Sequence, residues 1–160
     1  MQAADGTLFE STEQGGFTRR GVIFRSSTAG AYSVVNTFAG TDPLLPAGSL
    51  IADSDGSSYG TSCLGGAFNA GTVFRVAFGA PPFFPLITVL HSFAYWDGLC
   101  PRGAMAFGLD AALYGTTAQY GLGGRGTIFR WAAWFGNLPI GVCTARRDPV
   151  VRPEGARSSG

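Results

Sequence analysis

Short apolar runs alternate with glycine-rich turns along most of the chain, and none shows the 3.6-residue period of an amphipathic helix. Asp55 and Gly56 separate two such runs, and Asp-Gly between strand-like segments is a strong hairpin signal. The pattern therefore predicts four short antiparallel strands in this part of the chain, at residues 48–52, 58–61, 71–76 and 86–93.

The same pattern recurs along the sequence. Phe24 and Phe74 close matching runs 50 residues apart, and Phe129 closes a third run 55 residues after Phe74. Phe38 and Phe93 end a later matching run at the same spacing of 55. A period of this length is typical of modular repeats, and four strands in ~50 residues is the size of a propeller blade. The predicted fold is all-β: tandem four-stranded antiparallel blades in an incomplete, propeller-like array.

The repeat sets the predicted domain organisation. A β-repeat domain spans 1–144, with a partial blade at 4–40, a full blade at 46–95 and a third blade at 101–144 whose end is frayed. The first blade begins at its second strand. The tail at 145–160 is rich in Pro, Arg and Ser without an apolar period, which predicts disorder. So few blades cannot close a ring, because propellers typically have four to eight.

Composition narrows the function classes. The net charge of the 160 residues is +1, which gives no electrostatic footprint for nucleic acid. No run approaches the ~20 apolar residues of a membrane-spanning helix. The first residues have neither the charged start nor the apolar centre of a signal peptide, and no anchor is expected.

Three cysteines occur, and their spacing matches no zinc pattern. Cys63 and Cys100 both fall in predicted loops. In an oxidising compartment they can form a disulfide, which leaves Cys143 as a free thiol. A set of three free thiols is the alternative.

As a set, the repeated motifs resemble those of GloVer-type tandem repeat proteins, a choice-of-anchor family. The match extends over about residues 4–130, with a weaker similarity to kelch repeats in the Gly-Gly doublet. The resemblance implies secreted or surface-anchored bacterial proteins with many repeats, and it implies no catalytic residues. The motifs are Leu90-His91-Ser92-Phe93, Asp97-Gly98 with Pro101, Asp55-Gly56, Tyr59-Gly60-Thr61, Tyr114-Gly115-Thr116-Thr117, Gly65-Gly66, Gly71-Thr72-Val73-Phe74 and Gly126-Thr127-Ile128-Phe129.

Candidate chemistry is sparse. His91, the only histidine, is expected on one strand face with Val89 and Phe93, and its repeat counterpart Asn36 cannot act as a base. A packed polar residue is therefore favoured over a catalytic one. The segment 53–56 resembles the start of a calcium loop, but its glycine falls fourth rather than sixth, so a turn is favoured.

Three further features have structural interpretations. The glycine-rich segment 121–126 precedes a predicted strand, whereas a phosphate-binding loop opens a helix. Equivalent arginines are expected on the face of Val73 and Ile128, as strand-end charges rather than as a ligand-binding row; they are Arg25, Arg75 and Arg130. Equivalent aromatic residues are expected in the core between blades rather than in a sugar-stacking platform; they are Phe9, Tyr59 and Tyr114.

These observations predict no catalytic, cofactor-binding or metal residue, and no cofactor. The expected function is a non-catalytic secreted or cell-surface module for binding or structural spacing, with a glycan or protein ligand. Further repeats or self-association are expected to cover open blade edges. The alternatives are a hydrolase or lyase acting on polysaccharide and a truncated repeat fragment without independent function. Any individual function is expected in the loops that differ between repeats, at 14–20, 63–70 and 118–125.

Overall fold

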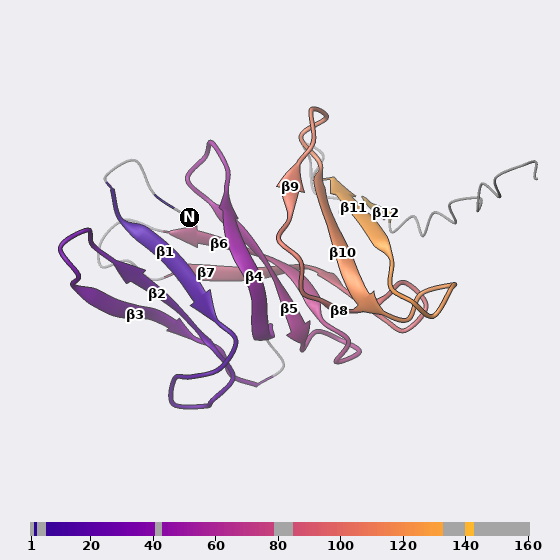
Figure 1. Cartoon of the computed structure of the whole chain (residues 1–160), viewed down its shortest axis with the longest axis horizontal. Helices are drawn as coiled ribbons and strands as arrows, with labels where there is room; N and C mark the ends of the chain where they lie inside the picture. The colour runs from indigo at the N-terminus through magenta and orange to yellow at the C-terminus, as the bar shows by residue number, and fades with distance from the viewer. Residues whose placement is uncertain (1, 3–5, 41–42, 79–84, 133–139, 143–160) are drawn as a thin grey trace, which may run out of the picture.

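The computed structural model describes residues 2, 6–40, 43–78 and 85–132, and the backbone of 140–142. The prediction of an all-β fold is confirmed: the described residues form three antiparallel sheets and contain no helix (Figure 1). Accordingly, no helix among them is long and apolar enough to cross a membrane. The predicted tail at 145–160 and Cys143 lie outside the described residues.

The first sheet consists of β1 (Leu8–Thr12), β2 (Val22–Ser26) and β3 (Tyr32–Thr37), in that order. Gln2 forms a single antiparallel bridge with Leu8, at the position where the other sheets have their first strand.

The middle sheet has the order β4 (Leu44–Ala52), β5 (Ser58–Leu64), β6 (Thr72–Phe78) and β7 (Pro85–Ser92). β4 begins four residues earlier than predicted, and its pairing with β5 shifts between Ala47 and Ile51.

The third sheet has the order β12–β11–β10–β8, and β9 pairs with β10 beside β8. β8 and β9 correspond to the two halves of β4, since Pro101 pairs with Thr117 as Pro46 pairs with Ser62. The strands are β8 (Leu99–Pro101), β9 (Ala106–Phe107), β10 (Leu113–Gln119), β11 (Ile128–Ala132) and β12 (Ile140–Val142).

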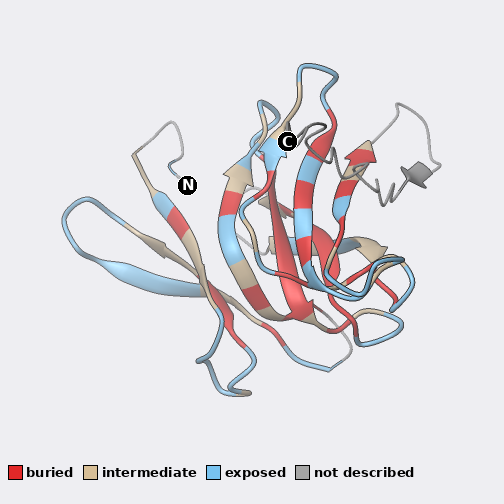
Figure 2. Cartoon of the chain, turned by 45° about the vertical axis from the view of Figure 1, so that its right-hand side comes forward, coloured by how far each residue is buried: buried red, intermediate tan, exposed pale blue. Residues whose placement is uncertain are grey.

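The three sheets stack face to face, and the middle sheet is covered on both faces. Figure 2 shows that buried residues are concentrated in the centre of the stack, whereas the outer strand of the first sheet is largely exposed. None of the three sheets closes on itself within the described residues. One core lies between the first and middle sheets: Phe9, Ile23, Phe38, Leu50, Phe74 and Val76. The other lies between the middle and third sheets: Tyr59, Ala70, Val73, Phe93, Met105, Leu113, Phe129 and Trp131.

Equivalent residues build both contacts between sheets, which we call joints. Phe38 meets Phe74 with ring centroids 5.6 Å apart, and Phe93 meets Phe129 at 5.1 Å, both edge to face. In each pair, the first phenylalanine directly follows the last strand of one sheet. The second lies in the next sheet, on β6 or on its equivalent β11. The joint is therefore part of the repeat.

A backbone hydrogen bond also recurs at each joint. The Leu45 amide donates to the Arg20 carbonyl at 3.0 Å, and the Cys100 amide donates to the Ala70 carbonyl at 2.9 Å. Both donors have a positive φ, 54° for Leu45 and 55° for Cys100, which few non-glycine residues adopt. The sheet-to-sheet contact therefore fixes an unusual backbone conformation twice.

A disulfide joins Cys63 of β5 to Cys100 of β8 and so links the middle and third sheets. The expectation that these cysteines lie in loops is wrong, because β5 extends to Leu64 and because residues 99–101 pair with β10 as the short strand β8. The sequence allowed either a disulfide or free thiols at these positions, and the structure has the disulfide.

Candidate functional site

His91 holds a turn. Its Nε2 lies 2.9 Å from Oδ2 of Asp97, and Oδ1 of Asp97 accepts a hydrogen bond from the Ala94 amide at 2.7 Å. The prediction that Val89 shares the face of His91 is wrong. An irregularity opposite Val73 and Phe74 places Val89 against Phe74 and His91 against Val73, so alternation is interrupted between them.

The segment 53–56 forms the hairpin turn between β4 and β5. The Gly56 amide donates to the Asp53 carbonyl, and the Ser57 amide donates to Oδ1 of Asp55 at 2.8 Å. This amide and, more weakly, the Arg75 guanidinium lower the pKa of Asp55 below its usual value of 3.8. Among the described residues, no group of three or more His, Cys, Asp or Glu side chains is placed to hold a metal ion.

The equivalent arginines bind turn residues. Arg75 contacts Asp55 at 2.8 Å, and Arg130 donates to Oδ2 of Asp110 from Nε at 2.9 Å and from Nη2 at 2.6 Å. The Arg130 guanidinium lowers the pKa of the Asp110 carboxyl. Arg25 donates from Nε to the Ser33 hydroxyl. Two of the three arginines therefore tie a β-strand to the hairpin turn of the same sheet.

The equivalent aromatic residues divide into two environments. Phe9 and Tyr59 are buried in the joints, as predicted. Tyr114 is not: it is 37% exposed, and its hydroxyl donates to Asp110. The core interpretation fails for Tyr114 because it lies on the outer face of the third sheet.

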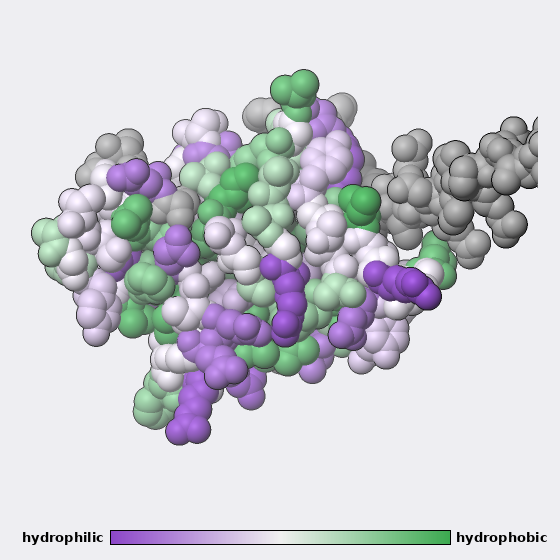
Figure 3. Space-filling view, viewed as in Figure 1, coloured by the Kyte–Doolittle hydropathy of each residue, from purple (hydrophilic) through white to green (hydrophobic). Residues whose placement is uncertain are grey.

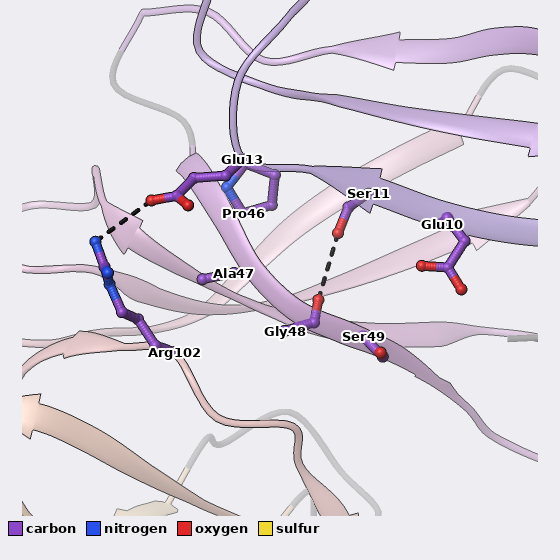
Figure 4. A pocket seen from close by; sticks show the side chains of 8 residues that line it. All are labelled: Glu10, Ser11, Glu13, Pro46, Ala47, Gly48, Ser49 and Arg102. Atoms are coloured by element: carbon purple, nitrogen blue, oxygen red, sulfur yellow. Dashed lines mark hydrogen bonds and ion pairs between the residues drawn. The ribbon is translucent and has the colours of Figure 1, made fainter.

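A polar groove of 370 Å³ lies between the end of β1 and the middle of β4. Hydrophilic side chains gather in this region of the face shown in Figure 3. Glu13 pairs with Arg102 at 3.4 Å, and Figure 4 shows Glu10 on the opposite side of the groove. Arg102 also donates from Nε to Sγ of Cys100 at 3.0 Å, so it lies over the disulfide. The remaining lining residues are Ser11, Pro46, Ala47, Gly48 and Ser49.

Four aromatic side chains form a second surface, on the loops of the middle and third sheets. Phe68 meets Trp96 edge to face with ring centroids 5.4 Å apart, and Tyr95 meets Tyr120 at 5.0 Å. All four are between 47% and 65% exposed. We call this set the loop aromatic surface.

The glycine-rich segment 121–126 supports this surface. It connects β10 to β11 and therefore precedes a strand, as predicted. The Gly121 amide donates to the Tyr95 carbonyl at 3.0 Å, which ties the loop to the turn that contains Tyr95 and Trp96. Variation between repeats pointed to the loops of Phe68 and Tyr120, but it did not indicate the turn at 94–97.

The repeats match a known family of proteins. The model of the Gloeobacter/Verrucomicrobia repeat matches residues 1–139, which is most of the chain. The chain belongs to the Gloeobacter/Verrucomicrobia repeat family. No curated protein and no solved structure matches it. In this member of the repeat family, the paired phenylalanines of the joints recur between units, whereas the four loop aromatic residues do not.

Proposed function

We propose that the chain is a non-catalytic β-repeat module for binding or structural spacing, with propeller-like blades in an incomplete array. The observation that carries this proposal is that the two joints are built alike. The recurring residues fold a sheet and attach it to the next one, as Phe74 and Phe129 do. Such stacked units bury a continuous core and present variable loops on their surface.

The outer face of the third sheet supports a role in further stacking. Val73 is fully buried in a joint, whereas its equivalent Ile128 is 57% exposed; Tyr59 is 7% exposed and its equivalent Tyr114 37%. We propose that a second copy or a further repeat covers this face, since the same positions are covered in both joints.

The first sheet differs at the corresponding place on its own outer face. Gly60 and Gly115 leave room for the rings of Phe74 and Phe129, whose Cζ atoms lie 2.5 and 2.4 Å from an added Cβ. The first sheet has Glu10 at this position. A charge there favours the role of a polar cap, which repeat stacks need at their ends.

The Cys63–Cys100 disulfide supports a secreted or cell-surface location, because disulfides persist in oxidising compartments. The family resemblance described above implies the same location.

A polysaccharide hydrolase or lyase is the second candidate, favoured by the groove. Glu10 and Glu13 place two carboxyl groups along it, and paired carboxylates are the usual machinery of glycoside hydrolysis. However, the Glu13 carboxylate is already engaged by the Arg102 guanidinium at 3.4 Å, so this group is not free to contact a substrate without breaking that ion pair.

A turnover assay separates these two candidates. The full chain is incubated with a panel of neutral and acidic polysaccharides, and reducing ends and unsaturated products are measured. We expect no product above a blank. Product release that Glu10→Gln or Glu13→Gln abolishes, with an unchanged melting temperature, would contradict the proposal and establish the enzyme.

A further inference from the structure

The four residues of the loop aromatic surface are not required by the repeat. The first repeat has Gly40 and Thr41 at the positions of Tyr95 and Trp96. Thr18 stands at the position of Phe68, and the middle repeat has Gly65 at the position of Tyr120. At the described positions Thr18, Gly40 and Gly65 these units fold with small or polar residues, so joint packing does not account for the aromatic side chains.

Tyr120 shows this most directly. Its φ is 61°, and its equivalents Gly15 and Gly65 also have positive φ, of 118° and 88°. A bulky residue in this conformation is strained, whereas glycine is not. A tyrosine with a half-exposed ring offers no core packing in return.

The turn that carries Tyr95 and Trp96 is held rigidly. The Asp97 and Gly98 amides both donate to the Ala94 carbonyl at 3.0 Å, which closes the turn around the two aromatic residues. The Asp97 carboxylate is fixed by His91 on one oxygen and by the Ala94 amide on the other. His91 is therefore a positioning residue for this turn.

The neighbouring elements are fixed to the same turn. The Thr127 hydroxyl donates to the Asp97 carbonyl at 2.9 Å. On the other side, the Ala67 amide donates to the Ser92 hydroxyl at 3.2 Å, next to Phe68. Surfaces that are ordered before binding lose less conformational entropy when a ligand arrives.

We propose that the loop aromatic surface is a carbohydrate-binding site. The two ring pairs are edge to face, so their members present differently oriented faces and edges, against which the C–H faces of pyranose rings can stack. Tyrosine hydroxyls and the Trp96 indole N–H supply hydrogen-bonding groups for sugar hydroxyls. The inference deepens the proposed function, on which it rests, by naming the ligand class.

The ionic character of the region points to a neutral rather than a strongly charged sugar. His91 and Asp97 contact one another at 2.9 Å and are mostly covered, with side chains 22% and 15% exposed. Arg125 is an exposed cation in the adjoining loop. One exposed cation in an adjoining loop is a weak determinant for a polyanion, so stacking supplies most of the affinity.

The test is a glycan array of neutral and acidic oligosaccharides probed with the full chain, followed by titration calorimetry with a binding oligosaccharide. The variant Tyr95→Gly/Trp96→Thr carries the residues of the first repeat at these positions, and its melting temperature shows whether it folds. Phe17→Ala is the matched control, because Phe17 is a fully exposed aromatic residue in the first sheet's loop.

We expect the wild type to bind oligosaccharide, the double variant to bind at least tenfold more weakly, and Phe17→Ala to bind like the wild type. If the double variant fails to fold, Phe68→Thr carries the same test. The site is refuted if no glycan binds, or if folded Tyr95→Gly/Trp96→Thr binds as tightly as the wild type. The turnover assay above is independent of this result and tests the module itself.

Discussion

Phe93 meets Phe129 edge to face across the joint between the middle and third sheets, with an interplanar angle of 62°. Phe38 and Phe74 repeat this contact one joint earlier, at 66°. All four rings are at most 1% exposed. The same aromatic pair therefore anchors both joints.

Replacing a ring of this pair should destabilise the whole stack. Phe93→Ala removes a fully buried ring and leaves a cavity, and we expect the free energy of unfolding to fall by about 3–5 kcal/mol. Urea denaturation followed by circular dichroism measures it. Phe17→Ala, at a fully exposed position, should change it by less than about 0.5 kcal/mol. Equal effects of the two substitutions would contradict the packing described here.

The glycine opposite each ring should be intolerant of any side chain. An added Cβ at Gly115 would lie 2.4 Å from Cζ of Phe129, so we expect Gly115→Ala to cost about 1–3 kcal/mol in stability. Gly123→Ala is the control, because an added Cβ there meets nothing within 4 Å and its φ is not positive. Thermal melting of both variants checks the difference. An unchanged melting temperature for Gly115→Ala would show that the ring can move aside.

The disulfide should contribute substantially to stability. It closes a separation of 37 residues between Cys63 and Cys100. The chain-entropy model gives about 3–4 kcal/mol for a loop of this length, so Cys63→Ala/Cys100→Ala should be less stable by about that amount. Reducing agent should lower the melting temperature of the wild type and leave that of the double variant unchanged. A wild type insensitive to a reductant that demonstrably opens the bond would contradict this estimate.

The turn carboxylate Asp55 should give stability a weak dependence on pH in acid. Its pKa in the folded state lies below 3.8, so below about pH 4 the unfolded state binds more protons and stability falls as pH falls. The contribution is fully present above that range. Asp55→Asn should therefore lower stability at pH 7 and flatten its decline between about pH 4 and 2. Asp53→Asn changes the same turn without removing the Arg75 contact and is the matched control. An acid decline as steep in Asp55→Asn as in the wild type would contradict this assignment.

The alternation of apolar and polar residues and the repeat period were sufficient to predict most strands, because each sheet is covered on at least one face. They failed at strand ends and irregularities. β5 continues through Cys63 although the apolar alternation stops earlier, since its backbone pairs with β6 and β4. The irregularity in the pairing of β6 with β7 beside His91 was likewise not predictable, because a two-residue period assumes uninterrupted alternation.

The stacking of the sheets was only partly predictable. Equivalence between repeats placed Phe9 and Tyr59 in the core, yet Tyr114 shares their motif and lies on an outer face. Which copy of a motif lacks a neighbour depends on its place in the stack rather than on its local sequence. The loop aromatic surface was not predicted because Phe68 and Trp96 lie in separate loops and meet only when β6 and β7 are paired.

The outer face of the third sheet allows the most direct test of this account. Analytical ultracentrifugation of the full chain over a range of concentrations should give a mass that rises above that of the monomer. Ile128→Glu should abolish this rise, whereas Leu109→Glu, in an exposed turn of the same sheet, should not. A wild type that stays monomeric at every concentration and melts in one cooperative transition would contradict the claim that the joint surface is left open for a partner.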